Sequence, residues 1–356
     1  MADLQINPRL IPQGSLVLVI GANGFIASHI IDQLLGAGYK VRGTVRDKAR
    51  TQWVNELFDG KYGAGYLHTV EVPDITLSGA FDEAVKGVNA IAHVASIMTL
   101  DPNPNNVIPP LITGTLGLLE AAAREPTVKR FVLTSSSHAV VFPRTGEKVT
   151  LEKDTFNSAA VKMAYAPPPY EKGRGMVVYA ASKLLVEQAV RKWVGLNPGR
   201  LEVNYVLPAT NFGPALHKDH PGSQPWRWPN ALYKNHPERI FIPSQYYIDV
   251  RDTARLHMAA LLMPTLTDSR IFGFAGVYTI NRLLGVLRKL YPNKEFSQDI
   301  PDEAVNLMVA PPAAEAEDLL KSMGRKGWVE LEDTVRENLK WEVQGLEQEH
   351  GQAELN

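Results

Sequence analysis

The chain has 356 residues, a length that suits two domains or one large domain with a smaller lobe. Its 37 Lys and Arg residues nearly balance 38 Asp and Glu residues, which argues against a nucleic-acid or anionic membrane partner. The absence of cysteine excludes disulfides, cysteine-ligated metals and thiol nucleophiles, so any redox chemistry needs a bound cofactor.

The first two thirds of the sequence alternate short apolar runs with stretches of helical periodicity. Continuous apolar runs are typical of parallel strands that are covered by helices on both faces. The alternation therefore predicts a Rossmann-type, doubly wound α/β sheet. The predicted strands are Leu16–Ile20, Val41–Val45, Thr69–Val72, Ala90–Val94, Phe131–Thr134 and Val203–Leu207, and the predicted helices between them are Phe25–Leu35, Leu111–Ala123 and Tyr179–Val194.

Two irregular segments, 137–178 and 208–247, follow predicted strand ends, where α/β sheets place their ligands. Beyond Asp249 the pattern is helical, with at most one or two short strands. The expected domains are an NADP-binding Rossmann domain over 12–207 with an insertion at 137–178, a mainly helical substrate-binding lobe over 208–342 that can return strands to the main sheet, and a polar tail over 343–356.

The N-terminal region has no long apolar segment. Its first apolar run, Leu16–Ile20, is too short for a signal-peptide core or a membrane span. We therefore expect a cytoplasmic protein without a membrane partner, either a monomer or a homodimer.

A glycine motif, Gly21-Ala22-Asn23-Gly24-Phe25-Ile26-Ala27, follows the first predicted strand and opens the first predicted helix. Gly21 permits a tight turn, Gly24 lets the backbone approach a pyrophosphate, and the small Ala27 lets helix and strand pack closely. The motif predicts a dinucleotide site, and a glycine turn that binds nothing is the alternative.

The second predicted strand ends at the place where such folds read the adenosine ribose. Arg46 there favours NADP, because a guanidinium can pair with a 2′-phosphate, and Lys48 or Arg50 can assist it. Asp47, one residue further on, could instead bind a ribose hydroxyl, so NAD is the less favoured cofactor. A further alternative is that Arg46 and Lys48 only form a solvated strand end. Asp74 follows the third predicted strand, where it can accept from the adenine amino group or form a turn.

Tyr179 and Lys183 are four residues apart and so share one face of a predicted helix. A nearby lysine cation is expected to lower the pKa of the phenol and to tune it as a proton donor. The strand Phe131–Thr134 is followed by Ser135, Ser136 and Ser137. One of these hydroxyls can hold a substrate carbonyl oxygen, while the others act as ordinary caps.

Taken in order, these motifs make the sequence resemble the extended short-chain dehydrogenase/reductase family. The shared motifs are Gly21xxGly24xxAla27, His93-Val94-Ala95-Ser96, Thr134-Ser135-Ser136, Tyr179xxxLys183 and Pro208-Ala209-Thr210-Asn211-Phe212-Gly213-Pro214. The likeness runs from about Pro12 to Gly327-Trp328. Within the family the sequence is similar to the dihydroflavonol reductase-like branch and, inside it, to fungal NADPH-dependent carbonyl reductases.

The resemblance implies a catalytic triad of Ser136, Tyr179 and Lys183, with Ser137 as the second choice of serine. His138 departs from the small residues often found there, and either it affects the pocket mouth or it is a plain loop residue. The predicted cofactor-binding residues are Gly21, Asn23, Gly24, Phe25, Ile26, Arg46, Lys48, Asp74, Ile75, Val94, Ala95, Ser96, Thr134, Tyr179, Lys183, Pro208 and Thr210.

The substrate pocket is expected to be mostly apolar, which favours an aryl or alkyl ketone or aldehyde over a polyol. Core packing is the alternative for every residue assigned to it. The candidates are Ile97, Met98, Val140, Phe142, Trp226 and Gln245. His217 and His220 are spaced like a pair of metal ligands, but the sequence offers no evident third ligand. A solvated loop is therefore favoured, and no metal is predicted.

The predicted function is an NADPH-dependent carbonyl reductase in which Tyr179 protonates the substrate oxygen. One alternative is a nucleotide-sugar epimerase or dehydratase on the same scaffold. Dehydratases of that kind carry an Asp-Glu pair where this chain has serines, and epimerases usually read the ribose with an acid where this chain has Arg46. The other alternative is a non-catalytic NADP-binding sensor, which commonly lacks the tyrosine or the lysine.

Overall fold

The computed structural model describes residues 5–77, 79–218, 220, 223–240 and 244–345. The predicted polar tail, 343–356, therefore lies outside the described residues from position 346 onward. None of the helices in the described ranges is both long and apolar enough to cross a membrane.

The main sheet has seven strands in the order β3-β2-β1-β4-β5-β6-β9, and every neighbouring pair is parallel. This arrangement confirms the predicted doubly wound fold, and the six predicted strands are present with ends shifted by at most two residues. The strands are β1 Leu16–Ile20, β2 Lys40–Val45, β3 Leu67–Glu71, β4 Ala90–His93, β5 Arg130–Thr134, β6 Glu202–Pro208 and β9 Arg270–Gly273.

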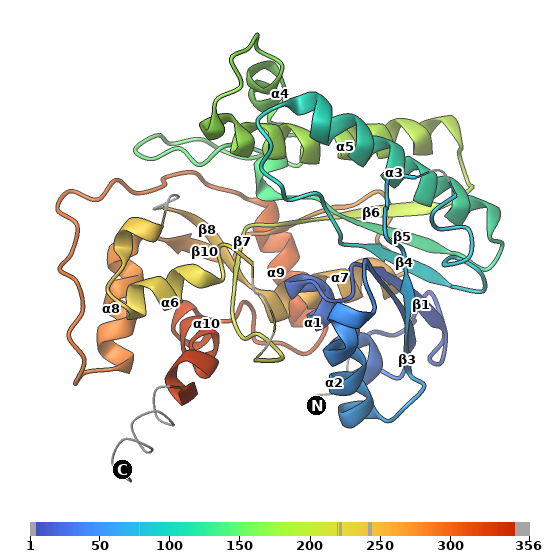
Figure 1. Ribbon diagram of the computed structural model, residues 1–356, viewed down its shortest axis with the longest axis horizontal. Coiled ribbons are helices and arrows are strands. Elements are labelled where there is room, and N and C mark those ends of the chain that lie inside the picture. The colour runs from blue at the N-terminus through green and yellow to red at the C-terminus, as the bar shows by residue number, and fades with distance from the viewer. Residues whose placement is uncertain (1–4, 78, 219, 221–222, 241–243, 346–356) are drawn as a thin grey trace.

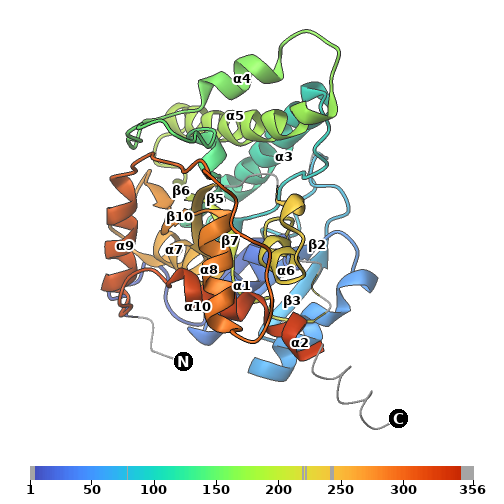
Figure 2. The ribbon, with the colours of Figure 1, turned by 90° about the vertical axis from the view of Figure 1, so that its left-hand side faces the viewer.

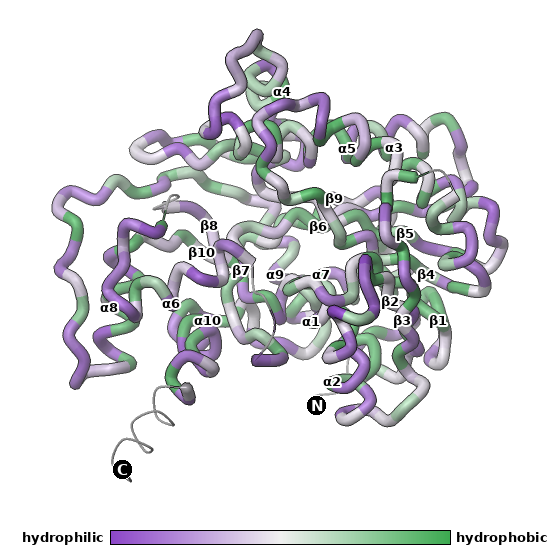
Figure 3. Tube along the Cα trace, viewed as in Figure 1, coloured by the Kyte–Doolittle hydropathy of each residue, from purple (hydrophilic) through white to green (hydrophobic). Residues whose placement is uncertain are grey.

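Helices cover both faces of the main sheet, with α1 and α7 on one face and α3 and α5 on the other (Figure 1). The apolar colours in Figure 3 concentrate along the inner strands that these helices enclose. Their bounds are α1 Phe25–Gly36, α2 Gln52–Tyr62, α3 Pro104–Arg124, α4 Ser158–Ala164, α5 Gly175–Leu196, α7 Val250–Leu262 and α9 Pro312–Ser322. Short 3₁₀ helices lie at Ala49–Thr51, Ser137–Ala139, Lys172–Arg174 and Pro237–Arg239.

One helix begins well before its predicted start. The sequence pattern predicted a helix from Leu111, whereas α3 begins at Pro104. Asn103 caps this helix by accepting a hydrogen bond from the backbone N–H of Asn105 at 3.1 Å, and Pro104 occupies the first turn, where its missing N–H costs nothing. The cap and the proline together set the start of α3.

The smaller lobe is built on a second sheet of three strands in the order β10-β8-β7, all labelled in Figure 1. Figure 2 views this lobe from the side and labels β10 and β7. This sheet and its helices enclose a second apolar cluster that includes Phe212, Leu232 and Tyr278. The sequence pattern did not predict β7 or β8. The bounds in the lobe are β7 Thr210–Phe212, α6 Arg227–Tyr233, β8 Gln245–Asp249, β10 Gly276–Tyr278, α8 Ile280–Leu290 and α10 Leu331–Asn338.

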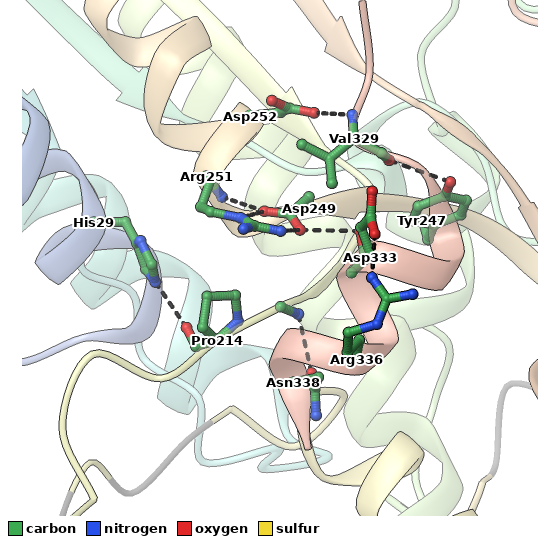
Figure 4. A network of polar contacts seen from close by, with 12 residues as sticks. His29, Pro214, Tyr247, Asp249, Arg251, Asp252, Val329, Asp333, Arg336 and Asn338 are labelled. Carbon is green, nitrogen blue, oxygen red and sulfur yellow. Dashed lines mark hydrogen bonds and ion pairs between the residues drawn. The ribbon is translucent and has the colours of Figure 1, made fainter. Parts of the chain in front are cut away.

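Polar contacts hold the segment that follows β7 in place (Figure 4). The Asn338 side chain, at the end of α10, accepts a hydrogen bond from the backbone N–H of Gly213 at 3.0 Å. Next to it, the His29 ring on α1 is hydrogen-bonded to the carbonyl of Pro214 at 2.8 Å. The segment that follows β7 is thus held from the C-terminal side and from the first helix of the sheet domain at once.

Candidate active site

A cavity of about 1190 Å³ lies at the carboxyl ends of the parallel strands, where the strand order reverses between β1 and β4. Residues at the ends of β1, β2, β4, β5 and β6 line one side of it. The smaller lobe contributes the opposite side through residues such as Trp228 on α6 and Gln245 on β8. The cavity therefore lies between the sheet domain and the lobe.

The glycine motif forms one end of the cavity. Gly21 has φ +85°, a left-handed conformation that favours glycine, and a Cβ there would lie 3.1 Å from the Cβ of Ala95. Gly24 is the N-cap residue of α1, and among the described residues no side chain caps this helix end. The first N–H groups of α1 are thus available to an anion such as a pyrophosphate, so the donors present fit a dinucleotide.

Two guanidinium groups line the cavity beyond the end of β2, those of Arg46 and Arg50. The Asp47 carboxylate is occupied locally, since it accepts from the backbone N–H of Ala49 at 2.9 Å and lies 3.3 Å from Nε of Arg50. Lys48, predicted as an auxiliary, does not line the cavity, and its backbone N–H donates to a neighbouring carboxylate. Asp47 also lines the cavity, so a guanidinium partner for a 2′-phosphate and a carboxylate acceptor for a ribose hydroxyl are both present at this end.

Asp74 forms a turn, and it is not among the residues that line the cavity. Its carboxylate accepts from the backbone N–H of Thr76 at 2.8 Å and from the hydroxyl of the same residue at 2.6 Å. These hydrogen bonds lower the pKa of Asp74. Of the two readings of Asp74, the turn is the one that the structure contains, while its neighbour Ile75 does line the cavity.

The other predicted cofactor residues line the cavity together. They are Gly21, Asn23, Gly24, Phe25, Ile26, Arg46, Ile75, Val94, Ala95, Ser96, Thr134, Tyr179, Lys183, Pro208 and Thr210. Further lining residues were not predicted from the sequence, among them Thr44, Thr51, Val72 and Asn211. Thr44 and Val72 lie at strand ends and carry no motif, whereas Thr51 and Asn211 lie in a 3₁₀ helix and a strand, β7, that no local pattern predicted.

Ser136, Tyr179 and Lys183 meet at the wall formed by the end of β5 and the adjoining face of α5. Ser136 and Lys183 are only 6% and 9% exposed. The Ser136 hydroxyl is hydrogen-bonded to Tyr179 and accepts from the backbone N–H of His138 at 3.2 Å. The Lys183 ammonium donates to the carbonyl of Thr134 at 3.0 Å and lies 6.0 Å from the centre of the Tyr179 ring.

The three consecutive serines have different surroundings. The Ser135 hydroxyl donates to Glu187 at 2.8 Å, and Glu187 is paired with Nε of Arg270 at 2.6 Å. The Ser135 hydroxyl is thus hydrogen-bonded to a buried ion pair and does not face Tyr179. Ser137 lines the cavity, but Ser136 is the serine that is hydrogen-bonded to Tyr179. The alternation of side chains along an extended segment explains why Ser135 and Ser136 face different partners.

Electrostatics in the site differ from the expectation drawn from the sequence. Burial raises the pKa of Tyr179, and the hydrogen bond with Ser136 opposes that increase. The expected lowering by Lys183 is not found. Burial instead lowers the pKa of Lys183 to about 8, so the lysine is still mostly cationic at neutral pH. Tyr179 therefore stays protonated at neutral pH and is a potential proton donor.

His138 packs against the edge of Tyr179, with ring centres 5.9 Å apart. Its other aromatic neighbour is Phe142, at 6.4 Å. Burial lowers the pKa of His138 to about 4, so the ring is neutral near pH 7. Of the two readings of this residue, the structure places it in the cavity lining rather than in a plain loop.

Only two of the six predicted substrate residues, Met98 and Gln245, line the cavity. Ile97 and Phe142 pack against the main core, and Val140 is buried within it. The Trp226 indole N–H donates to the carbonyl of Gly213 at 3.0 Å, which fixes that ring in the wall of the lobe. Those four assignments are corrected, because the side chains are used for packing.

Other apolar side chains take their place. We call Met98, Leu100, Met176 and Trp228 the apolar wall. Leu100 comes from a segment without any recognisable motif. Met176 lies three positions before Tyr179 and so shares its helix face, but the predicted helix began only at Tyr179, whereas α5 begins at Gly175. Trp228 lies two positions from the tryptophan that was predicted, and two positions on a helix point to different sides.

His220 is not part of a solvated loop, as the sequence favoured, because it is only 5% exposed. Its ring centre lies 5.8 Å from that of Phe25 and 5.4 Å from that of Trp53, and His217 stacks on Trp53. Burial lowers the pKa of His220 to about 4. Within the described part of the chain, no three His, Cys, Asp or Glu side chains are grouped to hold a metal ion.

Comparisons with known proteins agree with this architecture. The model of the NAD dependent epimerase/dehydratase family matches residues 17–272. Aldehyde reductase 2 of Sporidiobolus salmonicolor is 37% identical over 336 residues, which are 94% of this chain and 97% of that protein. The ketoreductase adrE of Penicillium rubens is 36% identical, over 92% of this chain and 96% of its own length.

Among solved structures, the yeast methylglyoxal/isovaleraldehyde reductase Gre2, complexed with NADPH, matches with a TM-score of 0.78 and 25% identity. The match covers 93% of this chain and 99% of that one. The fold, the motif order and these relatives agree. The chain belongs to the NAD dependent epimerase/dehydratase family, the extended branch of the short-chain dehydrogenases/reductases.

Proposed function

We propose that this protein is an NADPH-dependent carbonyl reductase that converts ketones or aldehydes to alcohols. The observation that carries the proposal is the meeting of Ser136, Tyr179 and Lys183 in a cavity that also holds the glycine motif and Arg46. The relatives named as an aldehyde reductase and a ketoreductase support this reaction class.

NADPH is the proposed cofactor because Arg46 and Arg50 face the end of the cavity where a 2′-phosphate would lie. The free N–H groups at the start of α1 would hold the pyrophosphate, and Lys183 would bind the nicotinamide ribose. When bound, NADPH supplies the hydride from C4 of its nicotinamide. The complex of yeast Gre2 with NADPH supports this choice over NAD.

The chain's own residues would supply the proton. Ser136 and Tyr179 would bind the carbonyl oxygen, and the Tyr179 hydroxyl would donate its proton as that oxygen becomes an alkoxide. The raised pKa of Tyr179 keeps the phenol protonated until that step. The Lys183 ammonium would then stabilise the phenolate that is left behind.

The apolar wall supports a substrate with an aryl or alkyl group. Met98, Leu100, Met176 and Trp228 offer no hydrogen-bonding counterpart to the hydroxyls of a sugar, apart from the Trp228 indole. His138 is neutral and packed against an aromatic ring, so it adds no charge to this side.

The proposal is tested by following NADPH and NADH oxidation against a panel of aliphatic, aryl and keto-ester carbonyls. We expect oxidation that is stoichiometric with the added carbonyl and faster with NADPH. A cofactor that stays bound on dilution and turns over only with a nucleotide sugar would favour an epimerase or dehydratase. Tight NADPH binding without turnover of any carbonyl would favour a sensor.

A further inference from the structure

A second, small cavity of about 10 Å³ adjoins Lys183. Its lining combines apolar side chains from β5, α3 and α5 with several polar ones. The lining residues are His93, Ala95, Ser96, Leu111, Thr115, Leu133, Thr134, Ser135, Ser182, Lys183 and Val186. This volume is about that needed for one water molecule, which also requires two or more polar partners.

His93 lies at the end of β4 and supplies an unpaired polar atom. The ring is 3% exposed, and its Nε2 is hydrogen-bonded to Oγ1 of Thr115 at 3.1 Å. Its Nδ1 is buried and has no hydrogen-bond partner among the described residues. Burial and the charge of Lys183 lower the pKa of His93 to about 3, so the ring is neutral, with one nitrogen donating and the other accepting. A buried polar atom left unpaired is costly.

The neighbouring polar groups leave few partners for that nitrogen. The Ser135 hydroxyl donates to Glu187 at 2.8 Å, and the Ser182 hydroxyl donates to the carbonyl of Tyr179 at 2.7 Å. Lys183 carries three N–H donors, and one of them is given to Thr134 at 3.0 Å. The Lys183 ammonium can therefore donate further hydrogen bonds, while Nδ1 of His93 can accept one.

We propose that one water molecule occupies the small cavity, accepts a hydrogen bond from the Lys183 ammonium and donates one to Nδ1 of His93. His93 would then act as a positioning residue that fixes Lys183 through this water. Nε2 of the ring would carry the proton and donate to Thr115. The catalytic consequence rests on the proposed function of Lys183 as the cation that supports the Tyr179 phenolate.

Other titratable groups face this region from each packed element. Glu187 on α5 accepts from Ser135, and His257 on α7 is hydrogen-bonded to Thr134. Tyr179 and His138 lie on the side of the main cavity. Burial lowers the pKa of both His138 and His257 to about 4, so both are neutral above that pH. Glu187 is held by Arg270 at 2.6 Å. At basic pH, Lys183 and Tyr179 are thus the groups whose titration governs activity.

Two substitutions of similar size distinguish the roles of the two ring nitrogens of His93. His93→Asn places an amide near the position of Nδ1, facing the water, and loses the contact with Thr115. His93→Gln reaches the position of Nε2, keeps the Thr115 contact and loses the group that faces the water. The measurement is kcat as a function of pH, because loss of the water would make deprotonation of Lys183 easier.

With His93→Gln we expect the basic limb of the kcat profile to move to lower pH by about one unit, the size of one charged hydrogen bond. With His93→Asn the limb should stay at the wild-type position. Any other pattern, with both variants shifted, neither shifted or only His93→Asn shifted, would overturn the positioning role. NADPH binding and thermal unfolding of each variant report whether it is folded.

A crystal structure of the unaltered chain with NADP tests the water directly. Ordered density for one water between Lys183 and His93 supports the proposal, and a dry cavity overturns it. This readout does not depend on catalysis. If the wild-type protein reduces no carbonyl, the proposed function is wrong. If the crystal structure shows no water between Lys183 and His93, the proposed water site is wrong, whatever the activity.

Discussion

The cavity has two walls that were built in different ways. The sheet-edge wall, with Gly21, Arg46, Ser136 and Tyr179, comes from the ends of parallel strands and the helices that follow them. The apolar wall comes from the loop after β4, from the first turn of α5 and from the smaller lobe. Chemistry at the first wall requires particular residue types at fixed places, whereas at the second any apolar side chain of suitable size can serve. The difference separates what is expected to set the reaction from what is expected to set the substrate.

Tyr179→Phe gives the largest expected effect, because it removes the proposed proton donor and leaves the ring in place. We expect kcat to fall by about 10³ to 10⁴, with NADPH affinity nearly unchanged. Steady-state kinetics and a fluorescence titration with NADPH measure the two quantities. Full turnover in this variant would show that Tyr179 is not the proton donor.

Ser136→Ala and Ser135→Ala form a matched pair on adjacent residues. Ser136→Ala should lower kcat by about 10² to 10³, because the hydroxyl that faces Tyr179 is lost. Ser135→Ala should keep kcat and lower the melting temperature, because it leaves Glu187 without a buried hydrogen bond. If the alanine at 135 cost the activity instead, Ser136 would not be the catalytic serine.

Arg46→Ala tests the cofactor end of the same wall. Because hydrogen bonds to charged groups are strong, we expect NADPH to bind about 10 to 100 times more weakly. NADH has no 2′-phosphate and should bind as it does to the wild type. Equal losses for both cofactors would mean that Arg46 holds the local fold and not the phosphate.

Met98→Ala should have the smallest effect, and it probes the apolar wall. Met98 is 57% exposed, so stability should hardly change, while KM for a bulky aryl ketone should rise by about 3- to 10-fold. Val140→Ala is the control in the core, expected to lower the melting temperature and leave KM unchanged. A change of KM that is the same for small and bulky carbonyls would contradict the assignment of Met98.

The same contrast explains which features could be predicted from the sequence. Six of the seven strands of the main sheet were predicted, because most of them are apolar runs in a regular alternation with helices, and the glycine motif must follow the first of them. The seventh, β9, was not predicted as a separate strand. β7 has three residues and pairs with β8, more than 30 positions later, which no local pattern reveals. Trp226 and Trp228 are alike in the sequence, and only tertiary packing decides that one donates to Gly213 and the other reaches the cavity.

The order of the main sheet also bears on how the chain can be synthesised and folded. β6 ends at Pro208, but its outer neighbour β9 begins only at Arg270, after much of the smaller lobe. Until β9 has left the ribosome, the outer edge of β6 in the nascent chain is unpaired. Because most β6 residues are buried in the folded protein, this exposed edge can serve as a template for aggregation. A fragment that stops after β6, although it holds Ser136, Tyr179 and Lys183, would keep that edge open and is expected to be insoluble.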